Sequence, residues 1–93
     1  MIKSVCDKVT LAVFRGRSAR ALPSDIQMRA QRLLEVLDAA TTLEDLRVPP
    51  SNRLHALKGD RRGQHALSIN KQWRICFRWE DGDAHDVEIT DYH

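Results

Sequence analysis

The chain has 93 residues, of which 42% are hydrophobic and 30% charged, and its formal net charge is +2. This length allows one domain, residues 1–93, because domains usually contain roughly 50 to 250 residues, and the apolar content excludes a disordered chain. The sequence has no pattern of a secretory signal, a membrane span or cysteine metal ligands. We therefore expect a reduced, cytoplasmic protein, and a disulfide between Cys6 and Cys76 is the less favoured alternative.

The two ends of the chain differ in charge. As far as Leu22 the only acid is Asp7 among several Lys and Arg residues, whereas acidic residues crowd the end and no Lys or Arg follows Arg78. Such asymmetry permits an anionic partner such as RNA although the net charge is small. One basic turn either is a solvated loop or contacts phosphates non-specifically, through Arg15, Arg17 and Arg20.

The first half of the chain predicts a short strand and two helices. Residues 2–5 can form the strand, and Asp7 suits the N-cap of a helix that runs to Phe14 and ends at Gly16. Ser24 and Gln27 have the spacing of a capping box and predict the start of the main helix. Its apolar stripe predicts packing on a sheet and consists of Ile26, Ala30, Leu33, Leu37 and Ala40.

The second half of the chain predicts strands. Residues 42–46 add one helical turn, which Pro49 and Pro50 stop because neither can donate a backbone hydrogen bond. The alternation of apolar and polar residues then predicts four strands, which turn-forming residues separate. The predicted strands cover residues 53–58, 65–69, 73–79 and 84–90. The order of strand, two helices and antiparallel meander predicts an α+β fold.

The hydrophobic pattern also predicts the register of the last hairpin, which contains Asp81-Gly82. A two-residue turn would pair Ile75 with Glu88, an apolar residue with an acid. We therefore expect a three-residue loop with a bulge, because it matches apolar residues across the hairpin. The expected pairs are Trp73 with Ile89, Ile75 with Val87, and Arg74 with Glu88.

Six residues supply the groups that metal-free cleavage of an RNA phosphodiester needs. That reaction requires a base for the 2′-hydroxyl, a cation for the charge of the phosphorane, and an acid for the leaving 5′-oxygen. The candidates are His55, Lys58, Arg74, Asp91, Tyr92 and His93. Because small basic proteins often contain such residues, the residue types alone make this site a hypothesis.

Some of these residues also have plain structural interpretations. Arg74 could pair with Glu88 across the hairpin, and Lys58 could be a solvated charge at a strand end; taken alone, each residue favours this interpretation. His65 and His85 share the parity of core residues, so we interpret them as buried or edge histidines outside the site.

Other kinds of site have weaker support in the sequence. A metal site at His55, Asp91 and His93 is conceivable, but no pair of ligands has the spacing of a helical or cysteine site. Neither Ser68 nor Cys76 has the sequence context of an activated nucleophile. We therefore expect no metal and no cofactor.

Several blocks of sequence together carry a family resemblance. They are Met1-Ile2-Lys3-Ser4, Leu37-Asp38-Ala39-Ala40, Arg53-Leu54-His55-Ala56-Leu57-Lys58-Gly59-Asp60-Arg61, Trp73-Arg74-Ile75-Cys76-Phe77, Gly82-Asp83-Ala84 and Asp91-Tyr92-His93. With these blocks the chain resembles, over essentially its whole length, the HigB-type toxins of the RelE/ParE superfamily. These are the toxins of type II toxin–antitoxin pairs.

The resemblance implies a RelE-like fold, with N-terminal helices packed on a mainly antiparallel sheet of four to five strands. It also implies a ribosome-dependent endoribonuclease that cuts mRNA in the ribosomal A site without a metal. The family motif falls on all six candidates. Their implied roles are base for His93 or Asp91, stabilisation of the phosphorane for Lys58 and Arg74, and acid for His55 or Tyr92.

The resemblance further implies partners and a rival function. The expected partners are the ribosome, mRNA and a HigA-type helix-turn-helix antitoxin, through which the chain would reach operator DNA only indirectly. A ParE-like gyrase inhibitor, or a non-catalytic RNA- or protein-binding module, is the alternative. Contacts to RNA are expected from Arg15, Arg17, Arg20, Arg53 and Arg61.

Overall fold

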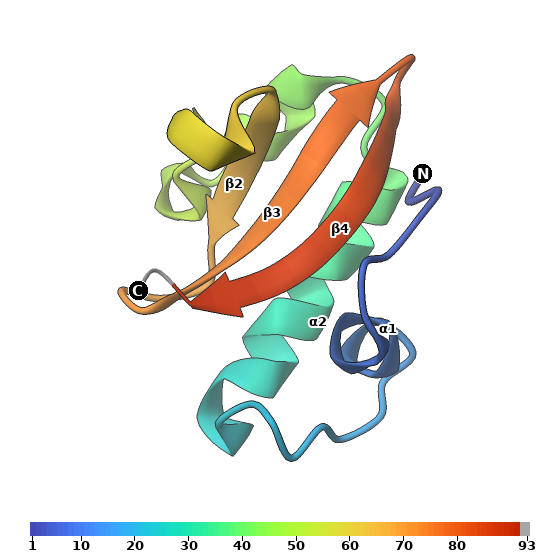
Figure 1. The fold of residues 1–93 in the computed structure, drawn as a ribbon, viewed down its shortest axis with the longest axis vertical. Coiled ribbons are helices and arrows are strands. Elements are labelled where there is room, and N and C mark those ends of the chain that lie inside the picture. Colours follow the sequence, from blue (N-terminus) through green and yellow to red (C-terminus); the bar gives the residue numbers. More distant parts are fainter. Residues whose placement is uncertain (92–93) are drawn as a thin grey trace.

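Two helices pack against one face of a four-stranded antiparallel sheet in the computed structural model, which describes residues 1–91 (Figure 1). The helices are α1 (Lys8–Phe14) and α2 (Ser24–Ala39), followed by the 3-10 helices η1 (Leu43–Arg47), η2 (Pro50–Asn52) and η3 (Gly59–Arg61). The strands lie side by side in chain order: β1 (His55–Ala56), β2 (Gln64–Ser68), β3 (Trp73–Glu80) and β4 (Asp83–Asp91). The predicted α+β fold is confirmed.

The first residues run alongside β4 without forming a regular strand. Isolated parallel bridges at Ile2 and Val5 join them to β4. Between the bridges, the N–H of Asp86 donates to the Ser4 hydroxyl at 2.8 Å rather than to a backbone carbonyl. The backbone of Asp86 has a φ of 53°, which interrupts the ladder, so the strand predicted over residues 2–5 is reduced to two bridges.

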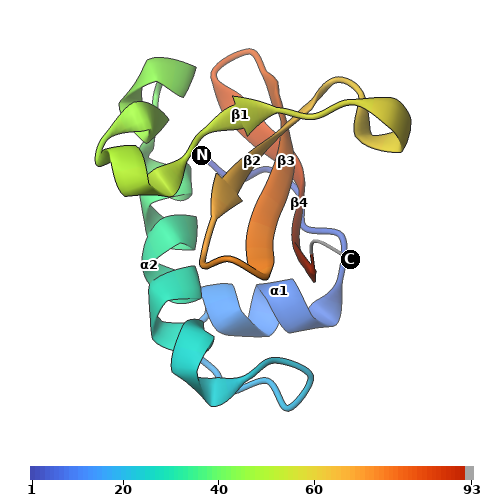
Figure 2. The same cartoon turned by 90° about the vertical axis from the view of Figure 1, so that its left-hand side faces the viewer.

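Both helices lie against the sheet (Figure 2), and their apolar side chains belong to the core. Asp7 caps α1 as predicted, and its Oδ1 accepts a hydrogen bond from the N–H of Thr10 at 2.7 Å. The predicted stripe of α2 is buried in the core, at Ile26, Ala30, Leu33, Leu37 and Ala40.

The start of α2 differs from the prediction in its cap. The helix begins at Ser24, but Pro23 is the N-cap and no side chain caps the first turn, so the predicted capping box is wrong. The Gln27 side chain turns back instead, and its Nε2 donates to the carbonyls of Ala19 at 2.8 Å and Leu22 at 3.1 Å. These bonds hold the loop that leads into the helix.

The hairpin between β3 and β4 has a two-residue turn, so the predicted three-residue loop is wrong. Asp81 and Gly82 join Glu80 to Asp83, and their φ values of 53° and 79° suit a primed turn, whose twist matches that of the flanking strands. The predicted bulge does occur, but it lies inside β4, where the pairing shifts opposite Phe77.

The bulge inside β4 corrects the predicted register. A bulge adds one residue to one strand, so Ala84 on one side of it and Val87 and Ile89 on the other all reach the core. His85 instead pairs with Arg78, so its predicted place on the core side is wrong. The observed pairs are Trp73 with Asp91, Arg74 with Thr90, Ile75 with Ile89 and Cys76 with Glu88.

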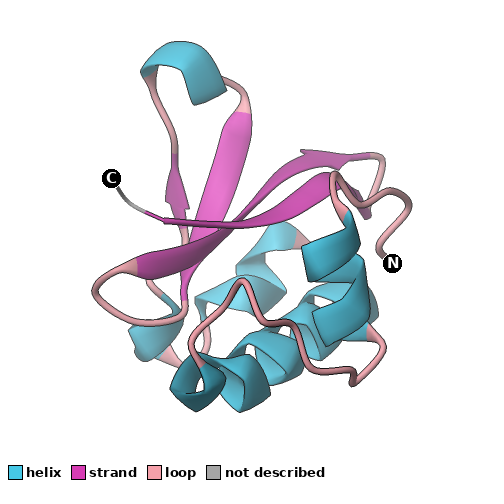
Figure 3. Cartoon of the chain, turned by 60° about the horizontal axis from the view of Figure 1, so that its bottom comes forward, coloured by secondary structure: helices cyan, strands magenta, loops and turns pink. Residues whose placement is uncertain are grey.

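The first strand of the sheet is shorter than the predicted strand over residues 53–58. Arg53 has a left-handed backbone (φ 49°) as the C-cap of η2, and Lys58 is the N-cap of η3, so only His55 and Ala56 pair with β2. The segment from β1 through η3 to the start of β2, residues 55–64, extends away from the helix layer, and we call it the arm (Figure 3).

One hydrophobic core lies between the helices and the sheet, and its largest fully buried side chains include Phe77, Leu34 and Leu37. The opposite face of the sheet, which we call the open face, has neither α1 nor α2 on it (Figure 3). Within residues 1–91, no helix has the length and apolar character needed to cross a membrane.

Candidate active site

The open face brings two of the predicted catalytic residues together. His55 pairs with Ala66 of β2, and two positions further along β2 Ser68 pairs with Arg74 of β3. Directly opposite residues of neighbouring strands project to the same face, so the side chains of His55 and Arg74 both belong to the open face. One strand and a two-residue offset along β2 separate them, which corresponds to roughly 12 Å between their backbones.

His55 is exposed on β1, and its ring is oriented by the backbone. Its Nδ1 lies 2.7 Å from the carbonyl oxygen of Arg53. A carbonyl oxygen only accepts, so this contact requires the proton on Nδ1. In the neutral ring, Nε2 therefore carries the lone pair and is the atom available for proton exchange with a ligand.

Lys58 lies two residues after the end of β1 and is exposed at the start of η3. Asp91 ends β4, where it pairs with Trp73, and its Oδ2 accepts from Nε2 of Gln72 at 3.0 Å. Asp91 lies at the same end of β3 as Arg74, but its side chain has the opposite parity in the sheet. The two remaining predicted catalytic residues, Tyr92 and His93, lie outside the described residues.

Next to Arg74 the surface forms a hollow of about 430 Å³, which we call the basic hollow. Its lining residues are Arg53, Ser68, Asn70 and Lys71. Among residues 1–91, the lining includes two cations and no acid. The sequence predicted an RNA contact for Arg53 and no role for Lys71; a lysine in the segment just before Arg74 was the available signal.

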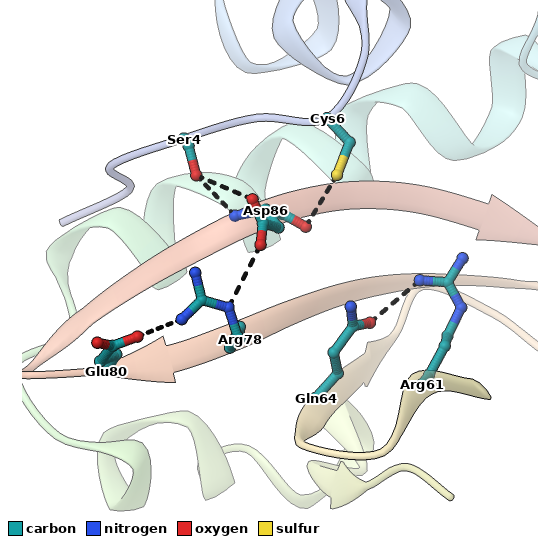
Figure 4. Close-up of polar contacts among 7 residues, drawn as sticks. All are labelled: Ser4, Cys6, Arg61, Gln64, Arg78, Glu80 and Asp86. Carbon is teal, nitrogen blue, oxygen red and sulfur yellow. Dashed lines mark hydrogen bonds and ion pairs between the residues drawn. The ribbon is translucent and has the colours of Figure 1, made fainter. Parts of the chain in front are cut away.

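The other predicted RNA-binding arginines lie elsewhere. Arg61 belongs to the arm, where its Nη1 donates to Oε1 of Gln64 at 3.1 Å (Figure 4). Its Nη2 donates to Oε1 of Glu88 at 2.8 Å. The bond to Glu88 raises the pKa of the Arg61 guanidinium. Because Glu88 lies opposite Cys76, the predicted cross-strand pair of Arg74 with Glu88 is wrong.

The basic turn after α1 lies in the helix layer. Arg17 and Arg20 line a separate hollow of about 510 Å³ together with residues of α2 such as Gln27 and Gln31, and Arg15 is the C-cap of α1. The structure therefore does not bring this turn to His55 on the open face.

The hairpin end of the open face is occupied by internal ion pairs. Nε of Arg78 donates to Oδ2 of Asp86 at 3.3 Å, its Nη1 contacts Glu80, and Asp86 in turn bonds to Ser4 (Figure 4). These pairs raise the pKa of Arg78, with the bond to Asp86 as the main cause. This end of the face consequently offers a neutralised surface.

His65 lies outside the site, as predicted. It stacks on Phe77 of the core at 6.1 Å between ring centroids, and burial lowers its pKa, with Arg47 and His55 contributing. Both cysteines are free thiols, and burial raises the pKa of Cys76, which disfavours the thiolate that a nucleophile requires. Residues 1–91 contain no group of three or more His, Cys, Asp or Glu side chains placed to hold a metal ion.

Comparisons with known proteins agree with this fold. The family described as "RelE-like toxin of type II toxin-antitoxin system HigB" matches residues 4–93. Endoribonuclease HigB of Proteus vulgaris is 33% identical over 100% of both chains, and Toxin HigB-1 of Vibrio cholerae is 46% identical over 70% of this chain and 68% of its own. The solved YoeB-YefM complex from Staphylococcus aureus contains a chain with the same fold, with a TM-score of 0.62 at 13% identity, over 100% of this chain and 98% of that one.

Proposed function

Because the chain belongs to the HigB-type, RelE-like toxins of type II toxin–antitoxin systems, we propose that it is an endoribonuclease that enters the ribosomal A site and cuts mRNA there without a metal. The observation that carries the proposal is that an oriented imidazole, His55, and a guanidinium, Arg74, lie on either side of β2 on the open face of the sheet.

In the proposed reaction, the 2′-oxygen of the RNA attacks the adjacent phosphorus while the bond to the 5′-oxygen breaks. His93 takes the proton of the 2′-hydroxyl, because the side chain of Asp91, the other candidate base, has the opposite parity to Arg74 in the sheet. Arg74 and Lys58 stabilise the negative charge of the phosphorane, since fixed cations at the developing charge lower the barrier. In this scheme the two side-chain cations take the role that a metal ion on the phosphate would have.

The leaving 5′-oxygen needs a proton, which His55 or Tyr92 supplies. The fixed Nδ1 contact supports His55, because it leaves Nε2 as the only ring nitrogen that can exchange a proton with the substrate. As an imidazolium, His55 would donate that Nε2 proton and regain it from solvent.

Cleavage of mRNA on programmed ribosomes, mapped by primer extension, tests this function. We expect cuts within the A-site codon with the wild-type chain, and a rate lower by a factor of roughly 10² to 10⁴ for Lys58→Ala or His93→Ala, because positioned proton donors, acceptors and cations contribute about that much. His85→Gln and Arg62→Ala are matched controls and should cut at the wild-type rate.

Two results would contradict the proposal. Intact mRNA in all codon contexts would remove the nuclease function, and growth arrest with defective DNA supercoiling would then favour the ParE-like alternative. Wild-type rates in Lys58→Ala and His93→Ala would reject the roles given to those residues while leaving the nuclease function in place.

Membership of a toxin–antitoxin family also supports an antitoxin partner. We propose that this antitoxin is a HigA-type helix-turn-helix protein, that the chain reaches operator DNA only through it, and that the ribosome and mRNA are the other partners. Because ribosomes are the proposed target, the place of action would be the cytoplasm.

A further inference from the structure

The basic hollow has the composition of an anion site. Arg53 and Lys71 are exposed cations, Ser68 and Asn70 are uncharged, and no acidic residue among residues 1–91 lines the hollow. On the rest of the open face the situation differs, because Arg61 and Arg78 already pair with carboxylates. The basic hollow therefore concentrates positive charge beside the candidate active site.

The turn that carries Lys71 is held in place from both sides. Oδ1 of Asn70 accepts from the backbone N–H groups of Gln72 at 2.8 Å and Trp73 at 2.7 Å, which fixes the turn itself. From the helix layer, Nε of Arg29 donates to the carbonyl of Ile69 at 2.6 Å. A cation on such a turn starts from a fixed backbone, which limits the entropy lost on binding a ligand.

The opposite wall of the hollow is coupled to His55. The N–H of Arg53 donates to the carbonyl of Pro50 at 3.0 Å, and the carbonyl of Arg53 accepts from Nδ1 of His55 at 2.7 Å. The floor of the hollow includes Ser68, which pairs with Arg74. The hollow is thus connected to His55 through Arg53 and to Arg74 through Ser68.

We propose that the basic hollow binds a backbone phosphodiester of the RNA next to the one that is cut, with Arg53 and Lys71 as positioning residues. The proposal rests on the proposed function for the identity of the anion, because the chemistry of the hollow fits any phosphate group. Holding the neighbouring phosphate would strengthen binding of the strand that lies beside His55 and Arg74, and a contact made equally in the ground state and the transition state lowers the concentration needed for cleavage without changing the maximal rate.

The first experiment measures binding without cleavage. A short fluorescein-labelled single-stranded RNA is titrated with wild-type protein and with Arg53→Ala, Lys71→Ala, the double variant and the control Arg32→Ala, which removes the same charge from the helix layer. We expect each hollow variant to bind roughly three- to fivefold more weakly, as for loss of an exposed ion pair. The dependence of log affinity on log salt should also fall by about 0.7 per lost phosphate contact.

Two further measurements separate positioning from catalysis and RNA from free phosphate. On programmed ribosomes, the hollow variants should need more protein for half-maximal cleavage while the maximal rate stays near that of Arg32→Ala. In two-dimensional NMR, the amide signals of Ser68 and Asn70 should shift on adding RNA at concentrations where inorganic phosphate leaves them unchanged.

The outcomes distinguish failure of this site from failure of the nuclease function. Equal RNA affinity and equal salt dependence in all variants would reject the site even if mRNA is cut, and so would a wild-type protein that does not bind RNA at low salt. Shifts caused equally by inorganic phosphate would reject RNA as the ligand. Weaker RNA binding by the hollow variants of a protein that cuts no mRNA would support the site and reject the nuclease.

Discussion

At the scale of single residues, His65 is a histidine whose protonation the fold disfavours. Its ring stacks on Phe77, its Nδ1 is buried without a hydrogen-bond partner among residues 1–91, and burial lowers its pKa. In the unfolded chain the imidazole titrates near its ordinary pKa of about 6.5, so below that pH the unfolded state binds more protons than the native state.

This difference predicts an acid-sensitive stability. The free energy of unfolding should decrease as the pH falls from about 7.5 to about 5, because the lowered pKa makes native His65 resist protonation. Urea unfolding of His65→Phe, which keeps an aromatic ring against Phe77, should show a smaller decrease, whereas His85→Gln should behave like the wild type. An equal decrease in His65→Phe would assign the effect to other groups.

At the scale of elements, the bulge in β4 is one extra residue, Asp86, inserted into an otherwise regular ladder. Without Asp86, Val87 would pair with Phe77, and the pairs on both sides of the bulge, Cys76 with Glu88 and Arg78 with His85, would stay the same. Deleting Asp86 would remove its bonds to Ser4 and Arg78, but it would also remove a non-glycine residue with a φ of 53°.

We therefore expect deletion of Asp86 to change the free energy of unfolding by no more than about 1 kcal/mol, since exposed polar contacts and left-handed strain are of similar size. Deletion of Glu88 should cost more, roughly 1.5 to 3 kcal/mol, because it turns Val87 out of the core. Denaturant unfolding of both variants compares the two. A larger loss for the Asp86 deletion would mean that the bulge itself supports the fold.

At the scale of the whole molecule, one ion pair ties the arm to the far strand of the sheet. Arg61 of η3 binds Glu88 of β4, and both side chains are 30% exposed. The arm also carries Lys58, so this pair limits how far Lys58 can move from the open face. We therefore predict a positioning role for Arg61, whereas the sequence predicted a contact with RNA.

A charge exchange distinguishes these two roles of Arg61. Arg61→Glu or Glu88→Arg alone should slow cleavage of mRNA, because each variant places like charges opposite each other, and the double variant should recover much of the rate. A direct contact with RNA would not be restored by the double variant. Urea unfolding should show a loss of roughly 0.2 to 1 kcal/mol in the variants Arg61→Ala and Glu88→Ala, as for partly exposed pairs.

The sequence by itself determined the fold class and most of the elements. Periodic apolar residues predicted α2 and the last three strands at the right places, because burial against one core imposes that spacing wherever the partner lies. The strands predicted over residues 2–5 and 53–58 are reduced to two isolated bridges and to His55–Ala56. The sequence also supplied the family and the types of the candidate catalytic residues. Local signals were less reliable. The spacing of Ser24 and Gln27 suggested a capping box, but the Gln27 side chain donates instead to the carbonyls of Ala19 and Leu22 in the preceding loop.

Only the tertiary structure decided the register of the last hairpin, the partner of Glu88 and the basic hollow. Each depends on which residues of distant parts of the chain lie together. With the two-residue turn, the bulge at Asp86 lets both Ala84 and Val87 reach the core, and Arg61 of the arm binds Glu88. Lys71 joined Arg53 for the same reason, since β2 brings the end of η2 and the start of β3 to one side of the sheet. Sequence patterns show periodicity along the chain, whereas a site depends on which residues of distant segments the fold brings close together.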